Sequence, residues 1–169
     1  MKWKSIFHSG KGGLAVDLVE GARLYALAAA QGLAIAQYNL GCCYRKGEGV
    51  PRDFVEAARL FRLAAEQGHA NAQASLANAY MHGEGVTVNY AAAMQLARRS
   101  ADQGNAAGEF YVGAIYANGW GMPQDARAAT LWFSRAASQG QKNAKAALLE
   151  LASEGVPEAT AAVRRLRLA

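Results

Sequence analysis

A repeat with a period of 36 residues is the feature that most constrains how this 169-residue chain can fold. The dipeptide Gln-Gly occurs four times, at residues 31–32, 67–68, 103–104 and 139–140. A second pattern, Tyr-x-x-Gly-x-Gly, starts at Tyr44, Tyr80 and Tyr116 and therefore has the same spacing. Several residue types keep one register over three or four copies, which is typical of a protein built from repeated structural units.

Each period contains two segments with the pattern of an amphipathic helix, which we name helix A and helix B. In the helix B segment of residues 53–67, apolar side chains recur on one helical face, at Ala57, Leu60, Phe61 and Ala64. Asp53 is a residue type that caps a helix N-terminus, and Gly68 is the type that ends a helix. The period therefore predicts a pair of helices punctuated by glycine.

Helix A, represented by residues 34–46, contains Gly41 beside its apolar face. A glycine lowers helix propensity by about 1 kcal/mol relative to alanine, so its presence needs a compensating reason. Because the equivalent residues, Ala77 and Gly113, are also small, we expect a neighbouring helix to approach closely at this position.

A two-helix unit of this size cannot bury its own apolar face, so the units are expected to stack into a superhelix. The predicted fold is all-α, a right-handed α-solenoid of antiparallel helix pairs in a single domain over residues 1–169. It comprises a partial first repeat, three full repeats and C-terminal capping helices, at residues 1–32, 33–68, 69–104, 105–140 and 141–169. The expected core consists of large residues at repeated positions: Leu40, Tyr44, Leu60, Phe61, Leu76, Tyr80, Tyr116, Trp132 and Phe133.

The pattern resembles the Sel-one-like repeat (SLR) family, a 36-residue relative of the tetratricopeptide repeat. The resemblance rests on Leu40-Gly41-x-x-Tyr44 in helix A, on the Gly-x-Gly-Val loop, and on a helix B that ends in Ala-Ala-Glu-Gln-Gly, best seen in residues 57–68. It implies an interaction module, because SLR proteins are mostly bacterial adaptors in signalling, envelope and host-contact processes, and some are immunity proteins. Many secreted members join the two helices of a repeat by a disulfide, and the lack of such a cysteine pair here favours a reducing compartment.

The distribution of charge and the hydropathy of the chain limit the classes of partner that we expect it to bind. The formal net charge is +5, but residues 1–12 and 135–169 carry the excess, and the body between them is nearly neutral. A body without recurring cations does not predict specific nucleic-acid binding. No apolar run approaches the roughly 20 residues that span a bilayer, and the first residues lack the apolar stretch of a signal peptide. The expected location is the cytoplasm, and a processed periplasmic form stays open.

Candidate chemistry is sparse in this sequence. The segment at residues 9–13, Ser-Gly-Lys-Gly-Gly, lacks the Gly-Lys-Ser/Thr ending of a phosphate-binding loop. His69 and His82 fall at opposite ends of one expected helix, about 20 Å apart at 1.5 Å per residue, so they cannot share a metal. Cys42 and Cys43 are adjacent and have no ligand or redox partner at suitable spacing. We therefore expect no catalytic residues, no metal and no cofactor.

The side of helix A opposite its apolar face varies between repeats, and a related solenoid would turn it toward its concave surface. This side predicts a partner-binding groove made of Tyr38, Cys42, Arg45, Asn78, Met81 and Phe110. Tyr38, Met81 and Phe110 are larger and more apolar than solvated positions require, as expected of anchors for a partner. The alternative is that they pack between adjacent A helices.

The function expected from these residues and from the resemblance is a non-enzymatic adaptor that presents a groove to a protein or peptide. Neutralising a secreted toxin, as an immunity protein does, is one form of that function. The alternative from a different class is an SLR enzyme acting on a cell-wall compound.

Overall fold

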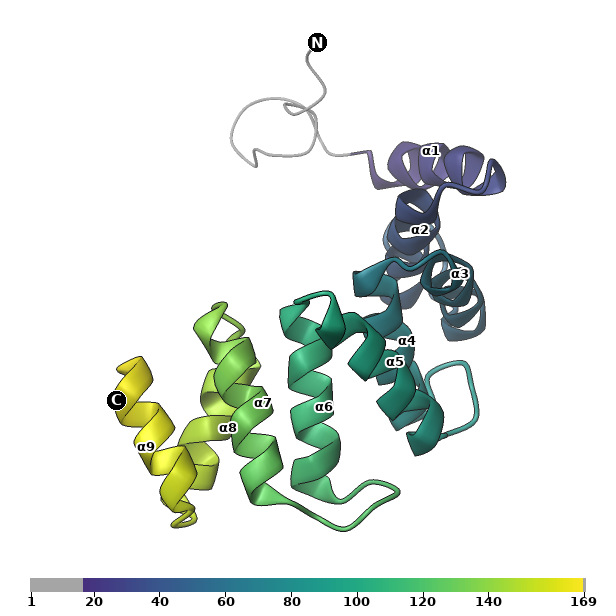
Figure 1. Ribbon diagram of the computed structural model, residues 1–169. Coiled ribbons are helices and arrows are strands. Elements are labelled where there is room, and N and C mark those ends of the chain that lie inside the picture. Colours follow the sequence, from purple (N-terminus) through teal and green to yellow (C-terminus); the bar gives the residue numbers. More distant parts are fainter. Residues whose placement is uncertain (1–16, 169) are drawn as a thin grey trace, which may run out of the picture.

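The computed structural model describes residues 17–168, and all the regular structure in this range is helical (Figure 1). The helices are α1 (Leu18–Ala30), α2 (Ala34–Lys46), α3 (Phe54–Glu66), α4 (Ala70–His82), α5 (Tyr90–Asp102), α6 (Ala106–Asn118), α7 (Ala126–Ser138), α8 (Lys142–Ser153) and α9 (Pro157–Leu166). The predicted all-α class is confirmed, and the helices follow the 36-residue period. Most of the partial first repeat, residues 1–16, lies outside the described residues.

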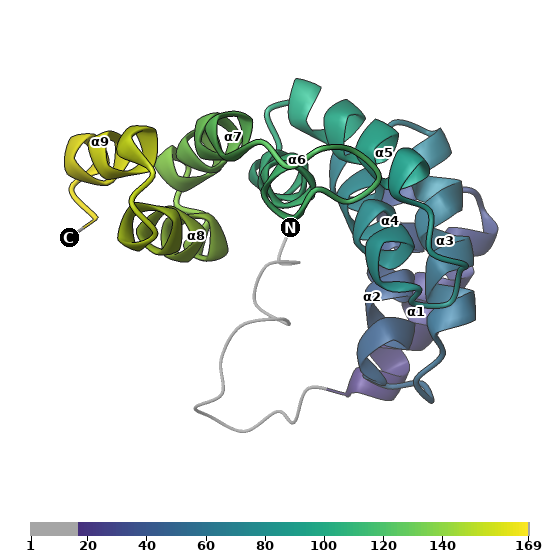
Figure 2. The same cartoon turned by 90° about the horizontal axis from the view of Figure 1, so that it is seen from below.

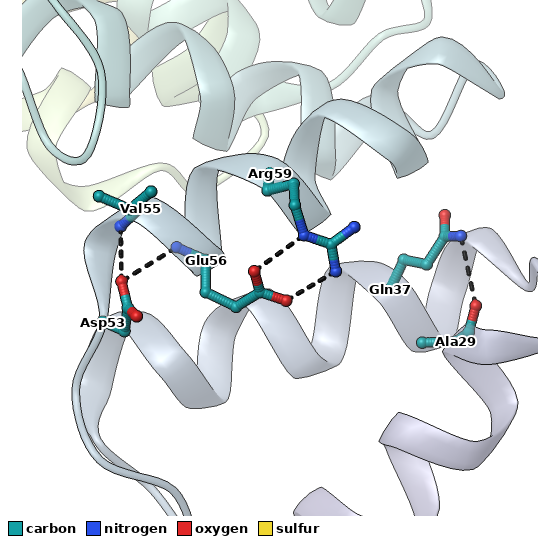
Figure 3. Close-up of polar contacts among 6 residues, drawn as sticks. All are labelled: Ala29, Gln37, Asp53, Val55, Glu56 and Arg59. Atoms are coloured by element: carbon teal, nitrogen blue, oxygen red, sulfur yellow. Dashed lines mark hydrogen bonds and ion pairs between the residues drawn. The ribbon is translucent and has the colours of Figure 1, made fainter.

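Local sequence sets the helix ends. Asp53 caps the N-terminus of α3, and its Oδ1 accepts hydrogen bonds from the backbone N–H groups of Val55 and Glu56 at 2.9 and 3.0 Å (Figure 3). Asn89 and Asp125 cap α5 and α7 in the same way. These side chains satisfy backbone donors that have no partner within the helix. The first three A helices, α2, α4 and α6, end at glycines in the left-handed conformation.

The helices form two curved rows (Figure 2). The A helices α2, α4, α6 and α8 make the inner row, and α1, α3, α5, α7 and α9 make the outer row. Each helix packs mainly against its neighbours in sequence, and α4 contacts α6 and α7 contacts α9 within a row. The inner row therefore offers one continuous face built from different repeats.

The core confirms five of the nine predicted buried residues, and four predictions are wrong. Leu40, Leu60, Phe61, Leu76 and Phe133 are buried. Tyr44, Tyr80, Tyr116 and Trp132 are only half-buried, and the last three also contact arginines at the surface. Arg62 Nη2 donates to Tyr80 Oη at 3.2 Å, and Arg98 Nη2 donates to Tyr116 Oη at 2.7 Å.

Trp132 lies beside two guanidinium groups. The ring centroid is 5.8 Å from Arg98 Cζ and 4.6 Å from Arg135 Cζ, within the range of cation–π attraction. This indole therefore packs against the core with one part and contacts two arginines at the surface with another.

The close approach expected at Gly41 is confirmed. A Cβ atom at Gly41 would lie 2.7 Å from Phe61 Cε1, and one at Gly113 would lie 2.6 Å from Phe133 Cδ1. The intervening repeat has Ala77 instead of glycine, and there helix B carries Ala97 instead of phenylalanine. Glycine on helix A is thus matched to a large ring on helix B.

The second glycine of the Gly-x-Gly loop has a structural role between repeats. A Cβ at Gly85 would clash with the carbonyl group of Phe54, the first residue of α3. Gly49 lies just as close to the carbonyl of Leu18 at the start of α1. Each of these two loops thus rests directly on the helix B that precedes it.

Candidate interaction surface

The inner face of α2 carries three of the residues that the sequence assigned to a groove. Tyr38, Cys42 and Arg45 are all half-buried. The Tyr38 ring stacks on the His69 ring with centroids 4.9 Å apart and lies tilted against Phe61 at 5.9 Å. The Arg45 Cζ is 5.8 Å from the Phe61 centroid. Each of these side chains is thus partly packed against its neighbours and partly exposed to solvent.

Residues from two further repeats extend this face. Asn78 of α4 is half-buried, and its Nδ2 donates to Glu84 Oε2 at 3.4 Å. The charges of Arg45 and Glu84 both act on Tyr111 of α6. The pKa of Tyr111 is raised, mainly by burial; Glu84 adds to the rise and Arg45 opposes it. We use the name central surface for Tyr38, Cys42, Arg45, Asn78, Glu84 and Tyr111, which come from three successive repeats.

Sequence reasoning missed Tyr111 and Glu84. Tyr111 directly follows the selected Phe110 and occupies the register position of Asn39 and Ser75. The variation of this register position between repeats was the signal that could have identified Tyr111. A helical face drawn through Phe110 omits it, however, because consecutive helical residues are about 100° apart.

Burial explains the raised pKa of Tyr38 on the central surface. The pKa of Tyr38 is raised to about 12, mainly because the charged phenolate would lose hydration, with Cys42 adding to the rise and Arg45 opposing it. The neutral phenol is therefore the form present at physiological pH, and it offers a hydrogen-bond donor beside a cation.

Met81 is a correction to the predicted groove. Its side chain is 4% exposed and packs with Ala77, Met94 and Ile115 in the core. The neighbouring helix B has the small Ala97, so the long Met81 side chain has room to enter. Met81 therefore packs in the core against both a B helix, through Met94, and an adjacent A helix, through Ile115, and does not present an exposed anchor.

Phe110 lies at the edge of a pocket rather than on the central surface. Its ring centroid is 5.6 Å from that of Phe133 and 5.4 Å from that of Tyr111. The pocket lies between α6 and α8 and has a volume of about 430 Å³. We name it the α6–α8 pocket; it is lined by Phe110, Ala114, Ala117, Asn118, Gln124, Phe133, Asn143, Ala146, Ala147, Glu150, Leu151 and Glu154.

The pocket was missed because the family motifs fade after Gly140. Its far wall is α8, where the repeat register still holds although the motif residues do not. Glu150 occupies the position of Cys42, Asn78 and Ala114 in earlier repeats. Extending the register past Gly140 would have placed it on the same face.

Within residues 17–168 no three His, Cys, Asp or Glu side chains are grouped to hold a metal ion. His69 instead caps α4, with Nδ1 accepting from Ala72 N at 3.2 Å. Cys42 and Cys43 are free thiols, and burial raises the pKa of Cys43, with Glu48 adding to the effect. A reactive thiol needs the opposite shift. None of the described helices is both long and apolar enough to cross a membrane.

Solved structures show the same architecture. A Sel1 repeat protein from Oxalobacter formigenes is 30% identical, with a TM-score of 0.78 over 92% of this chain and 66% of that one. The protein c5321, a protective antigen present in uropathogenic Escherichia coli strains, is 28% identical, with a TM-score of 0.77 over 91% of this chain and 34% of that one. This chain thus spans just under two thirds of the first relative and one third of the second.

A further match is the immunity protein Pa5087 from Pseudomonas aeruginosa, which is 19% identical. The match covers 80% of this chain and 64% of that one, and its TM-score of 0.42 marks only a distant likeness. No curated protein matches the chain significantly in sequence. The Sel1 repeat matches four consecutive segments, residues 5–33, 34–69, 70–105 and 106–141. Since these segments cover most of the sequence, the chain belongs to the Sel1 repeat family.

Proposed function

We propose that this protein is a non-enzymatic interaction module whose inner helical face binds a protein or peptide. The observation that carries the proposal is the central surface, where Tyr38 and Arg45 of one repeat and Tyr111 of another present aromatic and cationic groups together. Tyrosine and arginine are enriched among residues that dominate binding energy at protein interfaces. A single extended segment lying along the inner row would contact all of them.

The biological role that we propose is that of an adaptor, with toxin neutralisation as one form of it. Both forms use the same physical act, sequestering a segment of another protein. The two free thiols favour a reducing compartment such as the cytoplasm. No observation on the described inner face favours the alternative of a cell-wall enzyme.

Capture of partners from native lysate followed by mass spectrometry and titration tests the proposal. Arg45→Ala and Asn78→Ala remove central-surface side chains and are expected to weaken binding of the captured partner at least tenfold. Arg59→Ala is the matched control, because Arg59 is exposed on the outer row, where it pairs with Glu56. Equal capture by all variants would place the binding site elsewhere and refute the proposal.

A further inference from the structure

The α6–α8 pocket combines apolar walls with carboxylates that lack a counter-ion. Phe110, Ala114 and Ala117 line it from α6, and Ala147 and Leu151 line it from α8. Glu150 and Glu154 stand one helical turn apart on the same wall and are both exposed. Neither carboxylate has an ion pair or a side-chain hydrogen bond with any other described residue.

This lack of partners sets the two residues apart from most glutamates of the described chain. Those within 4 Å of a cationic group are Glu20, Glu48, Glu56, Glu109 and Glu158. The pocket carboxylates are thus exposed to solvent and have no protein counter-ion among the described residues, in a protein whose overall charge is positive.

The repeat register shows that this charge is specific to α8. Residues equivalent to Glu150 are Cys42, Asn78 and Ala114, and residues equivalent to Glu154 are Lys46, His82 and Asn118. All of these are neutral or basic side chains. The solenoid therefore forms without acidic residues at these positions.

The two carboxylates are also placed where they oppose helix stability. Glu150 lies in the last turn of α8, and Glu154 is the residue that caps its C-terminus. Negative charges at this end face the negative end of the helix dipole, and like charges at i and i+4 repel each other. A cation between them would offset both unfavourable interactions. A local arrangement that costs stability without a structural gain is typical of a binding site.

We propose that the α6–α8 pocket receives one lysine or arginine side chain from the protein partner. The aliphatic stem of that residue lies along the walls formed by Phe110 and Leu151, and its cationic head lies between Glu150 and Glu154. The side-chain amides of Asn118, Gln124 and Asn143 also line the pocket and accept further hydrogen bonds. The inference rests on the proposed function and adds the chemistry of the anchoring residue.

Selection of a random dodecapeptide phage library on the immobilised full chain tests this pocket directly. We expect selected peptides to contain a lysine or arginine next to apolar residues. Binding of the synthetic peptides is expected to fall at least tenfold with the isosteric double change Glu150→Gln/Glu154→Gln. Replacing the peptide arginine by citrulline, which keeps the shape and removes the charge, is expected to weaken binding by a similar factor. The citrulline peptide should bind the double variant no more weakly than it binds the wild type.

The stability of the variants separates binding from folding. Glu150→Gln/Glu154→Gln relieves the repulsion, so its melting temperature is expected to equal or exceed that of the wild type while peptide binding falls. Glu66→Gln is the matched control, because Glu66 is exposed at the end of α3 in the outer row and has no ion pair among the described residues. This control is expected to leave peptide binding unchanged.

Peptides that bind wild type and Glu150→Gln/Glu154→Gln equally, but lose affinity with Arg45→Ala, would overturn the pocket inference and leave the proposed function standing. Selection of no peptide would count against both. Spermidine or Mg²⁺ that binds with the same dependence on Glu150 and Glu154, with no basic peptide selected, would show a small-cation site and overturn the inference.

Discussion

At position 109 a carboxylate replaces the amide that the two preceding repeats carry. Gln37 and Gln73 accept hydrogen bonds from Gln67 and Gln103, respectively, at 2.8 Å in both cases. In the third repeat Glu109, 2% exposed, accepts from Gln139 Nε2 at 2.8 Å and forms an ion pair with Arg135 at 2.9 Å. The ion pair with Arg135 compensates the added charge, and the preceding repeat already carries an arginine, Arg99, at the equivalent position.

This arrangement predicts the effect of Arg135→Leu. The change leaves the buried Glu109 without its counter-ion, and we expect the free energy of unfolding at pH 7 to fall by about 1–3 kcal/mol. The double change Glu109→Gln/Arg135→Leu recreates the Gln37, Gln67 and Leu63 combination of an earlier repeat, so it is expected to recover most of the loss. Urea denaturation measures both, and a double variant no more stable than Arg135→Leu would contradict the explanation.

The raised pKa of Tyr38 predicts a specific dependence of stability on alkaline pH. The pKa of an unfolded tyrosine is about 10, whereas the pKa of the folded phenol is about 12. Between these values the unfolded chain releases a proton that the folded chain keeps, so stability falls as pH rises through this window.

Tyr38→Phe is therefore expected to make the decline between pH 10 and 12 shallower than in the wild type. Denaturation midpoints at several pH values measure the decline, and ultraviolet titration of tyrosinate measures the ionisation itself. If Tyr38→Phe removes a transition near pH 10 instead of near 12, the assigned burial of the phenol is wrong.

At the scale of elements, the contact between each Gly-x-Gly loop and the preceding helix B holds successive repeats together. Gly85 has a φ of 71° and no space for a Cβ beside Phe54. Gly68 has a φ of 86° but nothing within 4 Å of its Cβ position. Substituting either glycine thus strains the backbone, because both have a positive φ. Only a substitution at Gly85 also disturbs a contact between repeats.

We expect Gly68→Ala to cost about 1–2 kcal/mol, the usual penalty for a left-handed alanine. Gly85→Ala should cost about 1–3 kcal/mol more, because the added methyl group pushes the loop away from α3. Thermal and chemical denaturation of the two variants give this difference. Equal losses would show that the loop adjusts without strain and that the contact does not hold the repeats together.

At the scale of the whole molecule, burial is uneven along the solenoid. Leu24 of α1 is 48% exposed, whereas the equivalent Leu60 of α3 is 2% exposed. The difference arises because α2 packs on α3 within its repeat, and no described helix occupies that place against α1. In a solenoid each unit is stabilised mainly by its neighbours, so stability should follow this burial.

Hydrogen exchange is expected to show this gradient. The backbone amides of α1 should exchange faster than those of α4 and α5, which have neighbours on both sides. Mass spectrometry of peptic fragments after timed exchange measures the order. Protection of α1 equal to that of α4 would mean that further contacts cover its exposed leucines.

Much of the element level follows from the sequence because it depends on local chemistry. The 36-residue register, the caps at Asp53 and Asp125 and the glycines at helix ends each depend on a few adjacent residues. The small residue at position 41 also predicted a close helix approach. Four of the six candidate groove residues were similarly accessible, since the central surface contains Tyr38, Cys42, Arg45 and Asn78.

The sequence by itself determined the repeat, the helical class, the family and the inner face of helix A. Only the tertiary structure decided that Met81 turns into the core, that Trp132 lies beside two arginines, and that Glu150 and Glu154 line a pocket with Phe110. Each of these depends on how much space a neighbouring helix leaves. That space is set mainly by side chains of other helices, which are distant in sequence, so no local pattern contains it.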